Sequence, residues 1–211
     1  INKNEEELYR TMGAKKAVTI PLRQLPSILE KGSIEYRDSR PLHVLFTAST
    51  FSVTHNREGA EKVFRDIAPA LEKEAPGEFV IHVTGAKLPE KDIKKLPLNV
   101  RYEGYIPDFD AFMKTMDIAI TQSLGVVGMH GKLFAPVAQG IPTVGQSIAL
   151  AGFPFKDNEH LLFGESPEEV VKKLLSLRDT AVREKIGRGG RALSEELFSR
   201  SAIHAILRKV I

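Results

Sequence analysis

The sequence predicts an α/β protein of the Rossmann-like, doubly wound type, with a mostly parallel six-stranded sheet and helices on both faces. Six short apolar segments recur along the chain, and segments with helical spacing of apolar residues separate them. Short apolar strands that alternate with helices are typical of a parallel sheet buried on both faces. The length of 211 residues suffices for one such domain with a small appendage.

The first 41 residues lack the regular alternation of strand and helix patterns that follows them. Residues 4–12 show a helical pattern, and residues 17–20 form a short apolar run that predicts a strand. Residues 22–41 contain two prolines, a glycine and a charged run, which indicates a linker. The compact domain is therefore expected to begin at Leu42.

From Leu42 onward, each predicted strand is followed by a predicted helix. We expect strands at residues 42–46, 79–83, 100–102, 118–121, 142–144 and 161–163. We expect helices at residues 57–74, 92–96, 109–116, 133–139, 167–177, 180–197 and 199–210. His43 and His82 lie inside strand patterns and are interpreted as packing residues.

Parallel strands end on the same side of a sheet, and ligands of such folds bind beyond those ends. The loops expected on this rim follow Phe46, Gly85, Gly104 and Thr121. Any ligand site is therefore sought there.

A glycine-rich turn lies between the strand predicted at residues 118–121 and the next helix. It contains Gly125, Gly128 and Gly131, and Lys132 follows directly. Glycines let the backbone approach an anion closely, while a helix start and an ammonium group attract negative charge. We predict a phosphate site here. The spacing is neither GxGxxG nor GxxxxGK[ST], which disfavours the dinucleotide fingerprint and the P-loop.

Five further rim residues each leave two interpretations open. His130 either donates a hydrogen bond to phosphate or is structural. His55 and Asn56 either contact a ligand or cap the first helix of the domain, and capping is the preferred role for Asn56. Gly104 and Tyr105 either line a nucleotide base through their backbone groups or form a turn after a strand.

Composition excludes several classes of function. The chain has no cysteine, which removes disulfides, thiolate nucleophiles and zinc–cysteine sites and fits a reducing, cytoplasmic location. The net charge of +3 is spread along the chain, which suits an anionic ligand but does not indicate nucleic acid. Residues 133–155 are uncharged, but Pro136 and Pro142 disfavour a membrane span. No HExxH run or carboxylate pair indicates a metal site, and no catalytic residue is assigned.

Five segments in order resemble the nucleotide-sugar-binding lobe of group 1 (family 4) glycosyltransferases. HNREGAEKVFRDIAPALEKEAPGEFVIHVTG resembles the first helix and second strand of that lobe. NVRYEGYIPDFDAFMKTMDIAITQS resembles its third and fourth strands, and GMHGKLFAPVAQGIPTV its phosphate-loop helix. ESPEEVV with GRGGRALSEELFS resembles its closing helices, and NEEELYRTMGAKKAVTIP resembles the end of the preceding acceptor lobe.

The resemblance implies one lobe of a GT-B fold that binds a nucleotide diphosphate-sugar and takes part in transfer of the sugar with retention. It divides the chain into an acceptor-lobe tail with linker (1–41), the nucleotide-sugar-binding domain (42–197) and a C-terminal helix (198–211). The acceptor lobe is then missing, so this chain alone should not turn over. For the full protein, the resemblance leaves open a peripheral association with membranes. No cofactor beyond the donor substrate is implied.

The chain departs from the family at three places. Val127 and Ala135 stand where members usually carry glutamates that face the donor sugar and the ribose. The basic residue that members often have after the first strand is also missing. Lys132 is therefore the leading residue for a diphosphate contact. The alternative function is a degenerate, non-catalytic module that binds a nucleotide weakly or binds a partner protein.

Overall fold

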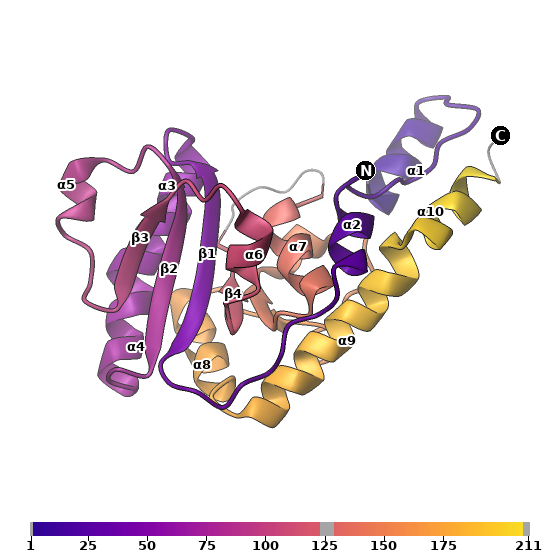
Figure 1. The fold of residues 1–211 in the computed structure, drawn as a ribbon. Helices are drawn as coiled ribbons and strands as arrows, with labels where there is room; N and C mark the ends of the chain where they lie inside the picture. Colours follow the sequence, from indigo (N-terminus) through magenta and orange to yellow (C-terminus); the bar gives the residue numbers. More distant parts are fainter. Residues whose placement is uncertain (1, 123–128, 209–211) are drawn as a thin grey trace.

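The computed structural model describes residues 2–122 and 129–208 and confirms the predicted α/β class (Figure 1). The strands are β1 (Leu42–Thr50), β2 (Phe79–Ala86), β3 (Val100–Gly104), β4 (Ile118–Ile120), β5 (Thr143–Gly145) and β6 (Leu162–Phe163). They form one sheet in the order β3-β2-β1-β4-β5-β6, and the pairings between these strands are parallel. The chain builds the sheet outward from β1 in both directions, as in doubly wound folds.

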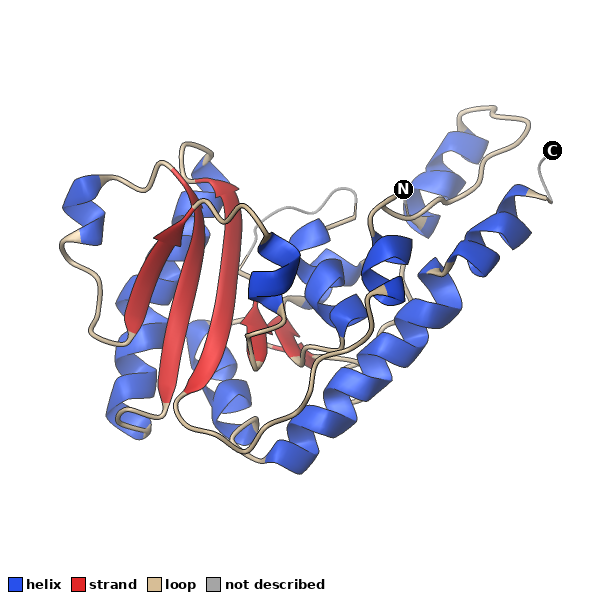
Figure 2. Ribbon diagram, viewed as in Figure 1, coloured by secondary structure: helices blue, strands red, loops and turns tan. Residues whose placement is uncertain are grey.

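Helices connect the strands, as Figure 2 shows. Those before the sheet are α1 (Lys3–Thr11) and α2 (Leu25–Glu30). Those between strands are α3 (Thr54–Lys62), α4 (Ala68–Glu74), α5 (Glu90–Ile93), α6 (Phe109–Met113) and α7 (Gly131–Gln139), together with a 3₁₀ turn at Ser147–Leu150. The last are α8 (Pro167–Ser176), α9 (Thr180–Phe198) and α10 (Arg200–Leu207). None of these helices is both long and apolar enough to cross a lipid bilayer.

The core has two parts, one on each face of the sheet. Side chains alternate between faces along a strand, so Val44 and Phe46 of β1 pack with α3, α4 and α8. Leu45 points the other way and packs with α2, α7 and the end of α9. Since both faces are covered, the central strands are apolar at nearly every position, which is the pattern that predicted them.

The helix predicted over residues 57–74 is present but starts at Thr54 and contains a π-helical turn at Val63–Ile67. In that turn the N–H of Ala68 donates to the carbonyl of Val63, five residues earlier. Pro69 has no N–H, and its ring clashes with the carbonyl four residues earlier in a regular α-helix. The wider turn accommodates the proline without ending the helix.

The N-terminal segment differs from expectation at two places. The strand predicted at residues 17–20 is wrong: the segment pairs with none of the described strands, and Thr19 bonds instead to the carboxylate of Glu6. Residues 22–41, interpreted as a linker, include helix α2, whose Leu25 is fully buried. A helix as short as α2 is stabilised by packing rather than by its own propensity, so local sequence did not reveal it.

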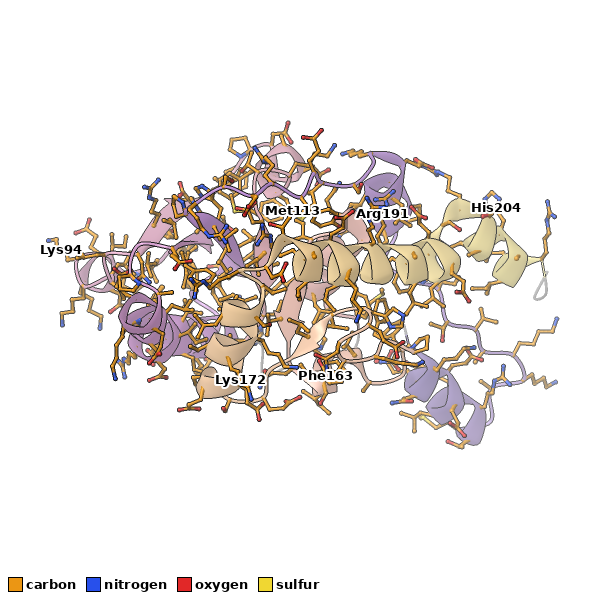
Figure 3. All side chains as sticks on the ribbon, turned by 90° about the horizontal axis from the view of Figure 1, so that it is seen from below. Lys94, Met113, Phe163, Lys172, Arg191 and His204 are labelled. Atoms are coloured by element: carbon orange, nitrogen blue, oxygen red, sulfur yellow. The ribbon has the colours of Figure 1, made fainter. Side chains whose placement is uncertain are left out.

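Hydrogen bonds from a side chain of α9 join this helix to the ends of α7 and α2. Arg191, a residue of α9 labelled in Figure 3, donates from Nη1 to the carbonyl of Ala138 at 3.0 Å and from Nη2 to that of Leu29 at 2.8 Å. These carbonyls lie in the last turns of α7 and α2, where helix carbonyls lack partners and the helix dipole favours a cation. Arg191 therefore holds the end of α7 and, with it, the orientation of the helix.

His43 and His82 do more than pack. His82 Nδ1 lies 2.7 Å from a carboxylate oxygen of Glu103, and His82 Nε2 lies 2.8 Å from His43 Nδ1. A carboxylate only accepts, so His82 carries its proton on Nδ1 and its Nε2 accepts from His43. The three side chains form one hydrogen-bonded chain across β1, β2 and β3. Burial lowers the pKa of His43, with a smaller contribution from the charge of His82.

This geometry predicts that acid destabilises the protein. Because the folded pKa of His43 lies below its unfolded value of about 6.5, the unfolded state binds the proton first. The contribution of His43 to stability is complete above pH 6.5 and falls as the pH drops through the folded pKa. Urea unfolding between pH 8 and 5 should show this loss. His43→Asn, which keeps an N–H donor but does not titrate, should show a smaller loss, and an identical pH dependence in both proteins would contradict the assignment.

Candidate functional site

The parallel topology confirms the predicted rim, because every strand of the sheet ends on the same side. Helix α3 starts beyond β1, and helix α7 starts beyond β4, the neighbour of β1. Three predicted site residues meet between these helix starts: His55, Asn56 and Lys132 line one small cavity of about 10 Å³. The sequence positions of these residues differ widely, and the adjacency of β1 and β4 brings them together.

Lys132 reaches from α7 to α3. Its ammonium donates a hydrogen bond to Asn56 Oδ1, and Asn56 Nδ2 donates to the carbonyl of Thr50 at 2.7 Å. Asn56 is 4 % exposed, so the Thr50 carbonyl fixes the orientation of the amide and turns Oδ1 toward Lys132. The prediction that Asn56 caps the helix is wrong, because α3 starts at Thr54 and Asn56 lies in its first turn.

The ammonium of Lys132 has no acidic partner among the described residues. None of the ion pairs within residues 2–122 and 129–208 includes it. Burial alone lowers its pKa, with no carboxylate to raise it again. A half-buried cation beside two helix starts, each the positive end of a helix dipole, produces a local positive potential suited to an anion.

The start of α7 contains two backbone N–H groups without an acceptor inside the helix. His130 is the N-cap residue and half-buried, and neither its side chain nor that of another described residue caps the helix. The N–H groups of Leu133 and Phe134 both donate to the carbonyl of His130, whereas those of Gly131 and Lys132 have no intrahelical acceptor. These two amides are the donors that the sequence predicted for phosphate.

A side chain at position 131 would be in tight contact with its neighbours. A Cβ placed there would lie 3.3 Å from Gln24 Nε2 and 3.3 Å from Leu22 Cδ1. The segment before α2 therefore packs against the α7 start, an association that sequence analysis did not suggest. Gly131 lets this segment and the helix start approach each other.

Some predicted residues lie elsewhere or cannot be placed. Gly125, Val127 and Gly128 lie outside the described residues. Ala135 is buried inside α7 and presents no polar group. Gly104 ends β3 with a φ of +68°, a conformation that favours glycine, and Tyr105 beside it is 78 % exposed.

β3 lies two strands from β1, so the Gly104–Tyr105 turn is on the same rim but at some distance from Lys132. The described residues contain no cluster of three His, Asp or Glu side chains arranged for a metal ion.

Two polar residues of the site were missed. Thr121 and Gln122 follow β4 directly, line the cavity beside Lys132 and are nearly inaccessible, at 6 % and 2 % exposure. Thr121 Oγ1 and Gln122 Oε1 have no hydrogen-bond partner in the described structure. The signal in the sequence was a polar pair directly after an apolar strand, at the rim where ligands bind.

A larger cavity lies away from this rim. It has a volume of about 970 Å³ and lies between α1, the 14–21 segment and the junction of α9 and α10. Figure 1 shows that α1 and α10 lie side by side at this end of the molecule. The cavity contains none of the predicted site residues.

The chain resembles several glycosyltransferases of known structure. It aligns over its full length with 42% of the chain of an S. aureus TarM mutant in complex with Fondaparinux, alpha-GlcNAc-glycerol and UDP, at 13% identity and a TM-score of 0.75. It aligns over 99% of its length with 61% of Anabaena HepE in complex with UDP and glucose, at 13% identity and a TM-score of 0.64. The chain thus spans less than half of TarM.

A structure of a single lobe also matches. This structure is the C-terminal domain of LpcC, a glycosyl transferase group 1 family protein from Francisella tularensis. The alignment includes 86% of this chain and 96% of the LpcC domain, at 16% identity and a TM-score of 0.58. At these identities the similarity establishes the fold. A search of curated proteins gives no match. The family profile described as "Glycosyl transferases group 1" matches residues 42–180. The chain therefore belongs to the group 1 glycosyltransferases and has the fold of one lobe of a GT-B enzyme.

Proposed function

We propose that this chain is the donor-binding domain of a retaining glycosyltransferase and binds a nucleotide diphosphate-sugar at the rim between α3 and α7. The observation that carries the proposal is the half-buried ammonium of Lys132, which has no acidic partner among the described residues and lies at the start of α7. A diphosphate supplies the missing negative charge. The complexes of TarM and HepE with UDP support a uridine nucleotide as the first ligand to test.

The chemistry assigned to these residues is electrostatic. When the bond between sugar and diphosphate breaks, negative charge grows on the departing diphosphate. In this proposal the ammonium of Lys132 and the N–H groups of Gly131 and Lys132 stabilise that charge, and helix α7 holds the two N–H groups in place. His130, His55, Gly104 and Tyr105 remain proposed ligand contacts on the same rim.

The proposal includes a second lobe for the acceptor. The chain covers less than half of TarM, and the segment that resembles an acceptor-lobe end borders the 970 Å³ cavity. In this proposal the acceptor lobe packs at that end of the molecule. Turnover then requires both lobes, whereas donor binding requires only this one.

One observation favours the alternative of a degenerate, non-catalytic module. The polar atoms around Lys132 enclose only about 10 Å³, and the ammonium is already bonded to Asn56. Ligand binding must therefore move Lys132 or its neighbours. If the free energy required for this movement exceeds the free energy gained from the diphosphate contact, the lobe does not bind nucleotides.

Calorimetry separates the two functions. UDP, GDP, UDP-glucose and GDP-mannose are titrated into the wild type, Lys132→Ala and Lys172→Ala. At least one nucleotide should bind the wild type, and Lys132→Ala should weaken it about tenfold or more, as expected for loss of a charge-assisted hydrogen bond. Lys172 is an exposed lysine on α8 and is the matched control, which should bind normally (Figure 3). Silence of the wild type with all four ligands excludes the donor-binding function.

A further inference from the structure

The rim contains two buried oxygen atoms that have no hydrogen-bond partner among the described residues. Thr121 Oγ1 and Gln122 Oε1 are shielded from solvent and accept no hydrogen bond within residues 2–122 and 129–208. Buried oxygens are normally paired, because an unpaired one loses its water without compensation. Two adjacent unpaired oxygens at the end of one strand indicate that a group outside the described residues completes them.

The free end of Gln122 is determined by its neighbour. Its Nε2 donates to the carbonyl of Thr121 at 3.0 Å. A carbonyl oxygen only accepts, so the amide nitrogen must face it and Oε1 must be the end without a partner. Gln122 therefore requires a hydrogen-bond donor. An ionised phosphate oxygen cannot be that donor, whereas a hydroxyl group can.

The surroundings specify the ligand further. Thr121 and Gln122 line the same cavity as Lys132, and its volume of about 10 Å³ is close to that of one water-sized group. A cation that attracts phosphate and an acceptor that requires a hydroxyl are thus side by side. A molecule that carries both groups, as every nucleotide and nucleotide-sugar does, satisfies both.

We propose that Gln122 Oε1, assisted by Thr121 Oγ1, accepts a hydrogen bond from a hydroxyl group of the ligand whose diphosphate binds at Lys132. The inference rests on the proposed donor-binding function and adds the residues that recognise the ligand hydroxyl. That hydroxyl belongs either to the ribose or to the transferred sugar. Gln122 is thereby a specificity residue and not only part of the scaffold.

The test is calorimetry on Gln122→Met, whose side chain has similar length and no polar atom. The ligands are UDP, UDP-glucose, GDP and GDP-mannose. Loss of one hydrogen bond should weaken binding about three- to tenfold. Equal weakening for a nucleotide and its sugar identifies a ribose hydroxyl. Weakening of the nucleotide-sugar alone identifies a sugar hydroxyl.

Two further variants separate recognition from folding. Thr121→Val removes only the hydroxyl and should weaken binding without lowering stability, because the lost oxygen was unpaired. Gln139→Met is the matched control. Gln139 is also buried, and its Oε1 is also without a partner in the described structure, but it is the last residue of α7, at the opposite end of that helix from the cavity. The Gln139→Met protein should therefore bind the ligand with normal affinity. If Gln122→Met does not fold, Thr121→Val decides by the same criterion.

Unchanged affinity in Gln122→Met and Thr121→Val, with binding still dependent on Lys132, overturns the inference and leaves the donor-binding function intact. In that case the cavity holds only a water molecule. A wild type that binds none of the four ligands overturns both proposals together.

Discussion

The substitution Arg183→Ala is expected to destabilise the protein by about 3 kcal/mol or more, the largest effect among the variants considered. Arg183 is 1 % exposed. Its Nη1 donates to the carbonyls of Leu177 and Arg178 at 2.6 and 3.0 Å, and its Nη2 donates to that of Arg37 at 2.7 Å. Alanine leaves the carbonyls of Leu177 and Arg37 without this donor and opens a void. The carbonyl of Arg178, by contrast, keeps its hydrogen bond from Arg40. Alanine also removes one of the hydrogen bonds between the segment before β1 and the start of α9.

The measurement is urea unfolding at pH 7 followed by circular dichroism. Arg188→Ala on the same helix is the control: the Arg188 side chain is exposed and pairs with Glu184 four residues earlier, so the loss should stay within about 0.5 kcal/mol. Unpaired buried carbonyls cost about 1 kcal/mol or more. If the free energy of unfolding of Arg183→Ala falls by less than this, water has replaced the guanidinium as the hydrogen-bond donor.

Gly59→Ala is expected to destabilise the protein, although replacing glycine by alanine usually stabilises a helix. Alanine is normally about 1 kcal/mol better than glycine inside a helix. A Cβ on Gly59 would lie 2.4 Å from the carbonyl oxygen of Gln122, and 3.4 Å from the ring of Phe46. Backbone cannot yield as a flexible side chain does, so α3 must move away from the strand end. We expect a loss of about 2 kcal/mol, in the range found for overpacked cores.

The same displacement should weaken nucleotide binding, because α3 carries Asn56, the hydrogen-bond partner of Lys132. Thermal unfolding and calorimetry with the nucleotide that the wild type binds measure the two effects. Glu61→Ala, at an exposed position of α3, is the control and should change neither. An increase in the melting temperature of Gly59→Ala would refute the close approach of α3 to the strand end.

The site was predicted less completely than the sheet. His55 and Asn56 were selected for their position on the rim, and Lys132 because it follows the glycine-rich turn at a helix start. The structure gathers the three around one cavity. The hydrogen bond between Lys132 and Asn56 joins residues 76 positions apart, and no local pattern reports such a pairing. The sequence also could not predict that Gln122 Oε1 lacks a hydrogen-bond donor in the described structure, because this depends on all the groups packed around the atom.

The failed predictions share this cause. The run at residues 17–20 has the composition of a strand, but a strand requires a neighbour, and none of the described strands lies beside it. Helix α2 has two turns at most and is stabilised by burying Leu25 against α7 and α9. In both cases packing with distant segments decided the backbone conformation, overriding local propensity.

From Leu42 onward, the amino-acid sequence by itself determined the order of the strands and of the main helices, the parallel sheet and the rim, because a strand buried on both faces must be apolar along its length and that pattern is local. The tertiary structure alone decided which polar groups meet at the rim and which of them stay unpaired. The physical reason is that charge compensation and hydrogen bonding act through space between segments far apart in the chain. Only in the folded protein, therefore, does Lys132 lack an acidic partner, and Gln122 Oε1 a donor, among the described residues.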